Sequence, residues 1–97
     1  MKLTVHEDAA KWYKEEMGLE DGDYVRIFTK LYGGIKTIFP SYFLGVLVGK
    51  EGQPAAKDEV AGITFYIKKE DQWILNEHDL EVQMGEDEAE FVFKERK

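Results

Sequence analysis

Between Val25 and Leu31 the sequence alternates large side chains in the way that an extended strand requires. Val25 and Ile27 fall on one side of such a strand and Arg26 and Phe28 on the other, because successive side chains point to opposite faces. β-branched and aromatic residues also favour strands in their own right. Since both sides carry large groups, the pattern predicts a central strand that is covered at least partly on both faces.

A second strand is predicted from Tyr42 to Val48, where the sequence is almost continuously apolar. Gly45 within it indicates a bulge or a close backbone approach. The two strands are joined by a loop that begins at Gly33 and Gly34, which can adopt backbone conformations closed to residues with a Cβ. We therefore expect a loop able to hold a ligand, although it contains no strong metal ligand or nucleophile.

The remaining sequence predicts one helix and several short strands. Ala9, Tyr13 and Met17 recur every four residues, which is typical of a helix from about residue 5 or 6 to 17 with one apolar face. Gly18 is suited to end this helix in a left-handed conformation. Further strands are expected at residues 63–67, 73–75, 80–84 and 91–93, and residues 50–58 have the composition of a solvated connection. These elements predict a mainly β (α+β) fold, with residues 1–97 as a single domain.

Composition excludes several classes of function. The net charge of −7 repels phosphate backbones, so nucleic acid is not expected as a partner. No apolar run reaches the roughly 18 residues of a membrane span, and the N-terminus has no signal-peptide core, so we expect a cytoplasmic protein without a membrane partner. The chain contains no cysteine. Disulfides, thiolate catalysis and thiolate-bound metal clusters are therefore excluded within it.

Only one short segment combines a histidine with acidic residues on both sides, namely Glu77, His78 and Asp79. Two hypotheses rest on it: a small hydrolase or isomerase that uses acidic residues, or a weak binder of ferrous or other divalent ions. Adjacent residues on a turn diverge, however, and a metal site needs three or four converging groups. We therefore expect a solvated turn here, with no cofactor, no metal site and no catalytic residue.

Aromatic residues gather around the glycine loop. Tyr32, Phe39 and Tyr42 flank it, and together with Gly33 and Gly34 they form the predicted ligand or partner surface. The alternative is that these rings belong to the core, because aromatic residues dominate cores as well as interfaces.

The order of the elements resembles that of a known family. The segments that carry the resemblance are Leu3-Thr4-Val5, Val25-Arg26-Ile27, Gly33-Gly34, residues 42–46 and residues 60–67. On these segments the chain is similar to the HesB/IscA-like family of iron-sulfur cluster biosynthesis proteins. The resemblance implies a HesB-like fold of two mixed β-sheets with one N-terminal helix, and a tendency to form homodimers.

The ligands of that family are missing from this chain. Its carrier members have a cysteine just after the glycine of the central loop, where Gly34 or Ile35 stands here, and two more in a Cys-Gly-Cys motif that would follow Phe93. The resemblance therefore implies a relative of cluster carriers that holds no cysteine-ligated cluster. We expect a non-enzymatic binding or accessory protein that acts on a protein partner.

Overall fold

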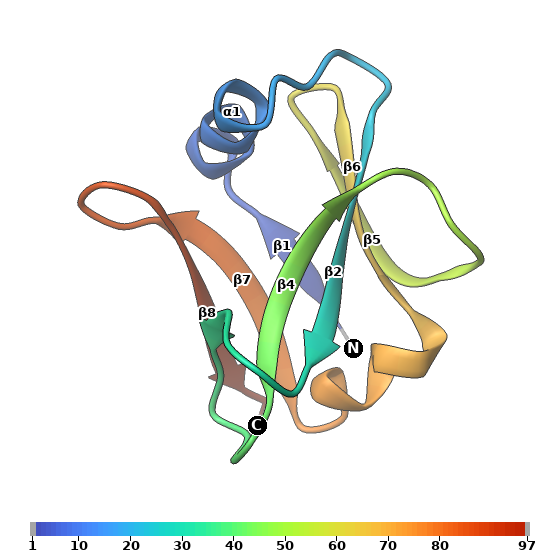
Figure 1. Cartoon of the computed structure of the whole chain (residues 1–97), viewed down its shortest axis with the longest axis vertical. Coiled ribbons are helices and arrows are strands. Elements are labelled where there is room, and N and C mark those ends of the chain that lie inside the picture. The colour runs from blue at the N-terminus through green and yellow to red at the C-terminus, as the bar shows by residue number, and fades with distance from the viewer. Residues whose placement is uncertain (1, 97) are drawn as a thin grey trace.

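The computed structural model describes residues 2–96, which form two mixed β-sheets and an α-helix at the upper end of the molecule (Figure 1). The strands are β1 (Leu3–Val5), β2 (Tyr24–Lys30), β3 (Ile35–Lys36), β4 (Phe43–Val48), β5 (Pro54–Val60), β6 (Ile63–Lys68), β7 (His78–Met84) and β8 (Ala89–Glu95). The helices are α1 (Glu7–Glu16) and the 3₁₀ helix η1 (Lys69–Leu75). One sheet has the order β1-β7-β8 and the other β3-β4-β2-β6-β5. The mainly β class, the two mixed sheets and the N-terminal helix are confirmed.

β2 is the central strand of the larger sheet, as its alternating pattern predicted. It pairs antiparallel with β4 and parallel with β6, and the side chains of Val25 and Ile27 are fully buried. On its other face the ring of Phe28 covers Gly45 of β4, where an added Cβ would lie 2.5 Å from the ring carbon Cζ. Gly45 thus marks a close approach, made by an aromatic ring.

Helix α1 packs its small residues against the core. Ala9 and Ala10 are fully buried and Tyr13 is nearly so, which confirms the predicted apolar face. Gly18 follows the helix with a φ of 63°, the left-handed conformation expected of it. Within residues 2–96, no helix has the length and apolarity needed to cross a membrane.

Two of the predicted elements are wrong. Residues 50–58 include five of the seven residues of β5, which pairs with β6 at the edge of the larger sheet. An edge strand with one exposed face can carry polar residues such as Lys57 and Glu59, so its sequence resembles a loop. Residues 73–75 belong to η1 instead of a strand. Periodicity cannot assign an apolar run as short as this one.

A buried carboxylate ties η1 to the central strand. Asp71 lies in the first turn of η1 and is only 5% exposed. It accepts a hydrogen bond from Thr29 Oγ1 at 2.6 Å and pairs with Arg26 Nη2 at 3.4 Å. Arg26 also lies 3.6 Å from Glu70 and 3.9 Å from Glu51, so the arginine is neutralised by three carboxylates. We call these contacts the Arg26–Asp71 network.

We expect Asp71→Ala to lower the free energy of unfolding by about 2 to 3 kcal/mol, because it leaves the half-buried Arg26 without its nearest partner. Glu70→Ala is the matched control, since Glu70 is exposed and an exposed ion pair contributes less than about 1 kcal/mol. Urea denaturation of both variants measures the difference. Equal small losses would show that the network does not stabilise the fold.

Candidate docking surface

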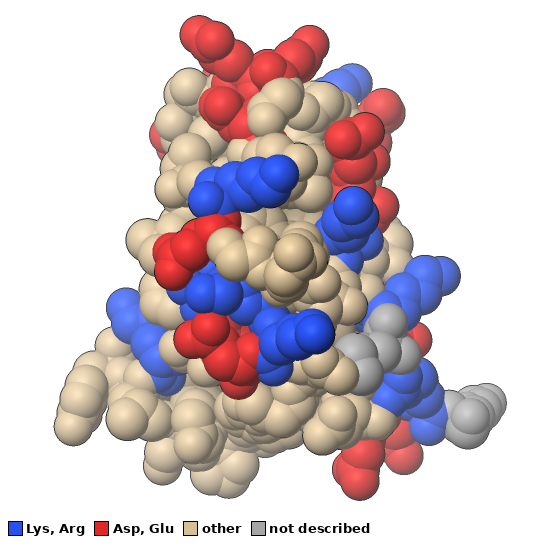
Figure 2. Space-filling view, turned by 90° about the vertical axis from the view of Figure 1, so that its right-hand side faces the viewer, with Lys and Arg blue, Asp and Glu red and all other residues tan. Residues whose placement is uncertain are grey.

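Exposed apolar side chains gather at one end of the molecule, in the loops on either side of β3. Tyr32 is 87% exposed, Leu31 56%, Ile38 53% and Tyr42 39%. This end lies at the bottom of Figure 1, and in Figure 2 uncharged residues form the lower left, below a belt of interleaved positive and negative charges. Leu47 and Val48, at the far end of β4, are the other large hydrophobic residues exposed among residues 2–96. We call Leu31, Tyr32, Ile38 and Tyr42 the loop-end surface.

The loop-end surface rests on a cluster of aromatic rings. The ring centroid of Trp73, from η1, lies 4.9 Å from that of Tyr42 and 5.0 Å from that of Phe39. Phe39 also lies 5.4 Å from Phe93 of β8, with the rings edge to face. Such pairs stabilise a fixed arrangement beyond their area of contact. The loop from β3 to β4 is therefore held by packing at both of its aromatic residues.

A hydroxyl group fixes the backbone of the same loop. Thr37 Oγ1 accepts a hydrogen bond from the backbone N–H of Phe39 at 3.0 Å and donates to the carbonyl oxygen of Tyr42 at 2.8 Å. A side chain that bonds to nearby backbone groups replaces the strand pairing that the loop lacks. The loop is thus closed across its own base.

The structure brings the five residues of the predicted ligand or partner surface to this one end. Tyr32, Gly33 and Gly34 are exposed, Tyr42 is exposed at the rim, and Phe39 is half-buried and packs against the core. The surface hypothesis thus describes Tyr32 and Tyr42, and the core hypothesis describes Phe39. Binding of a partner by these residues stays a prediction.

Gly34 has a structural role in this loop. Its φ is 129°, a conformation that residues with a Cβ rarely adopt, and an added Cβ would lie 2.6 Å from the carbonyl oxygen of Leu44. Gly33 has a φ of 61°, but its Cβ would meet only open space. The close approach of β3 to β4 therefore requires glycine at position 34.

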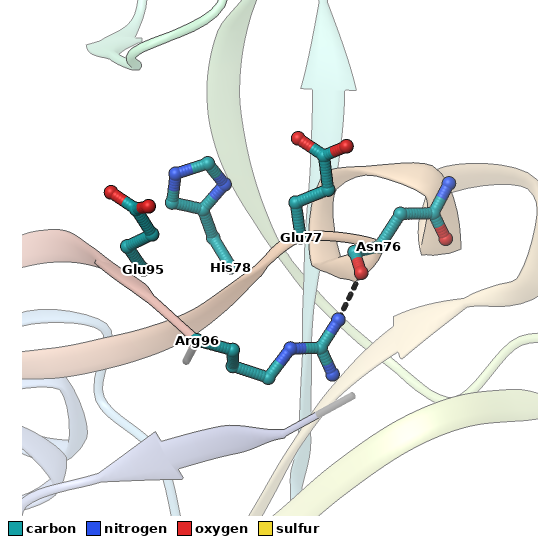
Figure 3. Close-up of a pocket in the computed structure, with 5 residues that line it drawn as sticks. All are labelled: Asn76, Glu77, His78, Glu95 and Arg96. Atoms are coloured by element: carbon teal, nitrogen blue, oxygen red, sulfur yellow. Dashed lines mark hydrogen bonds between the residues drawn. The ribbon is translucent and has the colours of Figure 1, made fainter.

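The segment around His78 borders a cavity of about 520 Å³ whose other lining residues are Asn76, Glu77, Glu95 and Arg96 (Figure 3). The side chains of Glu77, His78 and Glu95 point to one side of the chain, and that of Arg96 points to the other side, toward the carbonyl oxygen of Asn76, to which it donates.

The acid/base or metal cluster that the alternative hypotheses placed at Glu77, His78 and Asp79 does not form. The expected turn ends at Glu77, because β7 begins at His78. The imidazole of His78 lies beside the rings of Phe39 and Phe93, at centroid distances of 6.3 and 6.5 Å. Asp79 instead accepts a hydrogen bond from the backbone N–H of Lys2. His78 and Asp79 are neighbours in β7 and point to opposite faces of the strand, so the Asp79 carboxylate does not join the imidazole of His78. Nowhere in residues 2–96 do three His, Asp or Glu side chains converge as metal ligands.

A groove of about 660 Å³ lies between α1, β3 and the start of β8, and no pattern in the sequence indicated it. Its walls include Trp12 and Tyr13 of α1 and Phe91 of β8, whose ring lies 6.3 Å from that of Tyr13. Burial, together with the nearby carboxylate of Glu88, raises the pKa of Tyr13 to about 12. The four-residue spacing of Tyr13 with Ala9 and Met17 had indicated a core residue. Its side chain is indeed nearly buried, and it also borders the groove.

Two curated relatives resemble this chain along almost its whole length. One, from Bacillus subtilis, is named pyruvate dehydrogenase inhibitor; it is 43% identical over 94 residues, which is 97% of this chain and 98% of the relative. The other is an uncharacterised protein of Staphylococcus saprophyticus, 28% identical over 98 residues, 97% of this chain and all of the relative. No family model and no solved structure matches the chain.

The relative from Bacillus subtilis corrects the family assignment made from the sequence. The similarity to HesB/IscA-like proteins rested on short apolar segments and a glycine pair, which any mixed β fold with tight turns requires. A match over nearly the whole chain to a protein named as an enzyme inhibitor contradicts both that family and a role in iron-sulfur cluster biosynthesis. It also lends no support to the hydrolase, isomerase or metal-binding hypotheses around His78.

We expect Gly34→Ala to lower the free energy of unfolding by about 2 kcal/mol or more, because it combines an unfavourable φ with a clash against β4. Gly33→Ala should cost only about 1 kcal/mol, the cost of a left-handed alanine in open space. Chemical denaturation of the two variants tests this difference. Equal losses would show that β3 can move away from β4 to relieve the clash.

The raised pKa of Tyr13 predicts a loss of stability at alkaline pH. Because the folded state holds this proton more tightly than the unfolded chain, the stabilisation is complete below about pH 10 and is lost as the pH rises toward 12. Tyr13→Phe removes the titrating group. The urea midpoint of the variant should therefore fall less than that of the unchanged protein between about pH 9 and about pH 11.5. Parallel curves would contradict the burial of this hydroxyl group.

Proposed function

Because the chain belongs to the family of the Bacillus subtilis pyruvate dehydrogenase inhibitor, we propose that it binds pyruvate dehydrogenase and lowers the activity of that enzyme. The observation that carries this proposal is the 43% identity over 97% of the chain. A match of that extent spans both sheets and the loops between them. The surface by which a family member would bind its target is thus within the matched part.

The proposed role is regulatory and non-enzymatic, with a protein as the partner. It agrees with the sequence-based expectation of a binding protein, although the expected partner system was wrong. A homodimer and a cytoplasmic location stay predictions from the sequence. Inhibition by binding needs no catalytic residue in the inhibitor. It needs only a surface whose contacts with the enzyme outweigh the free-energy costs of desolvation and association.

We assign the binding of the enzyme to the loop-end surface. Tyrosine and other large side chains that become buried on association dominate the energy of protein interfaces. Tyr32 is 87% exposed and is thus free to insert into a partner. Tyr42 is held by its contact with Trp73, so that little conformational entropy would be lost when a partner covers it. These properties are what a docking surface needs.

The net charge of the chain supports a partner with a basic surface around the contact. A protein of net charge −7 is attracted to positive potential, which raises the rate of association more than the final affinity. Raising the salt concentration should therefore slow the association, because salt screens such long-range attraction.

We expect the unmodified chain to inhibit purified pyruvate dehydrogenase complex, assayed by pyruvate-dependent formation of NADH. Tyr32→Ala should raise the half-inhibitory concentration roughly thirtyfold, the effect of losing one interface residue worth about 2 kcal/mol. Ile38→Ala should act in the same direction. Leu47→Ala is the matched control, because Leu47 is also exposed but lies at the far end of β4.

Each outcome of this assay has a separate meaning. The proposed function fails if the unmodified, folded chain does not inhibit the complex at any concentration. The assignment of the surface fails if Leu47→Ala weakens inhibition as much as Tyr32→Ala does. Circular dichroism of the variants excludes unfolding as the cause, since both side chains are largely exposed.

A further inference from the structure

The groove between α1, β3 and β8 is bordered by the edges of both sheets. β8 is the last strand of its sheet and pairs only with β7, and β3 is the last strand of the other sheet and pairs only with β4. Residues 34–36, including all of β3, and residues 88–92, at the start of β8, line the same groove. Unpaired strand edges present N–H and C=O groups that can bind another extended chain.

The hydrogen bonds of β7 show which groups of β8 are free. The N–H of Leu80 donates to Lys2 and the C=O of Val82 accepts from His6, so both residues direct their backbone groups toward β1. Backbone directions alternate along a strand, so Glu81 directs its groups toward β8, where its partner is Val92.

The same alternation continues along β8. Val92 and Glu90 direct their backbone groups to β7, and Ala89 and Phe91 direct theirs away from it. The backbone N–H of Arg96 donates to the carbonyl oxygen of Glu77, which agrees with even-numbered residues at this end of the chain directing their backbone groups toward β7. Ala89 and Phe91 make no backbone hydrogen bond to another residue of 2–96. Both residues line the groove, where no further strand pairs with their backbone groups.

The side chains around this free edge define what would fit there. Trp12 and Phe91 offer apolar surface, and neither Trp12 nor Tyr13 makes a side-chain hydrogen bond to another residue of the described chain. Glu88 and Glu90 contribute two carboxylates and Lys36 one ammonium group, so the lining has a net negative charge. An apolar side chain beside a basic one would match both properties.

We propose that a short extended segment of the partner enzyme, carrying an apolar and a basic side chain, binds in this groove as an added strand on the free edge of β8. Addition of a strand to an open sheet edge is a common mode of peptide recognition, in which backbone hydrogen bonds give affinity and side-chain pockets give specificity. The inference rests on the proposed function. Gly34 borders the groove and follows Tyr32 by two residues, so one partner can cover both the groove and the loop-end surface.

Amide hydrogen exchange, resolved residue by residue by mass spectrometry, tests the added strand. The probe is purified pyruvate dehydrogenase complex, added at saturating concentration to the full chain. We expect exchange of the Ala89 and Phe91 amides to slow by roughly tenfold or more, because a bonded amide exchanges only after its bond opens. The amides of Glu90 and Val92 serve as internal controls, since they are bonded to β7 already.

The possible results separate this inference from the proposed function. Protection of residues 31–42 with unchanged exchange at Ala89 and Phe91 would overturn the added strand and leave the docking at the loop-end surface intact. Protection of Ala89 and Phe91 that rises with the concentration of the chain alone would identify a second copy as the occupant, and would also overturn it. Absence of both protection and inhibition would overturn the proposed function itself.

Charge reversal gives a second test that does not depend on exchange. Glu90→Lys should weaken binding to the complex roughly tenfold, because a like charge would face the basic side chain of the segment. Glu20→Lys changes the net charge equally, but it lies in the exposed turn before β2, outside the groove, and should have little effect. Equal weakening by both variants would mean that only the overall charge matters, and would contradict a basic segment in the groove.

Discussion

The arrangement of the lower end of the molecule depends on the contacts of one buried carboxylate, that of Asp71. It joins η1 to the central strand through Arg26 and Thr29. A buried ion pair is costly to desolvate, and its value is to specify one arrangement of the groups around it. Here it sets the position of η1, and η1 carries Trp73 to the rings of Phe39 and Tyr42. The loop-end surface is thus supported by a polar contact in the interior.

The two sheets are joined along one side and open along the other, and this asymmetry leaves two strand edges unpaired on the open side. On the closed side β1 lies beside β5, and the backbone N–H of Val5 donates to the Asp58 carboxylate at 2.8 Å. On the open side the edge strands β3 and β8 line a common groove. The free edges of β3 and β8 therefore lie along the open side, and the loop-end surface lies at the lower end of the molecule. Both surfaces are available without any change of the fold.

The family assignment shows how far short motifs can be trusted. Order and spacing of apolar segments predicted two mixed sheets with an N-terminal helix, and this architecture is confirmed. The same segments suggested the wrong family, because apolar alternation reports which side chains face a core and says nothing about what the surface binds. Because the chain has no cysteine, its candidate binding surface consists of exposed apolar and aromatic side chains. The relative from Bacillus subtilis is named as an enzyme inhibitor.

The sequence by itself determined the local elements whose side-chain pattern is strong. Alternation placed Val25 and Ile27 in the core, four-residue spacing placed α1, and glycine at position 18 ended it. These features depend on near neighbours in the chain, so the sequence shows them directly. It also drew attention to the aromatic residues around the glycine loop.

Only the tertiary structure decided which of those aromatic residues are exposed, that polar residues form β5, and that β3 and β8 leave a groove between them. Each depends on contacts between segments far apart in the chain, such as Phe39 with Phe93 and Arg26 with Asp71. A tyrosine with the same local sequence packs in a core or extends into solvent according to what the distant chain brings beside it. For that reason Tyr32 and Phe39, two aromatic residues of the same loop region, came to lie on the surface and against the core respectively.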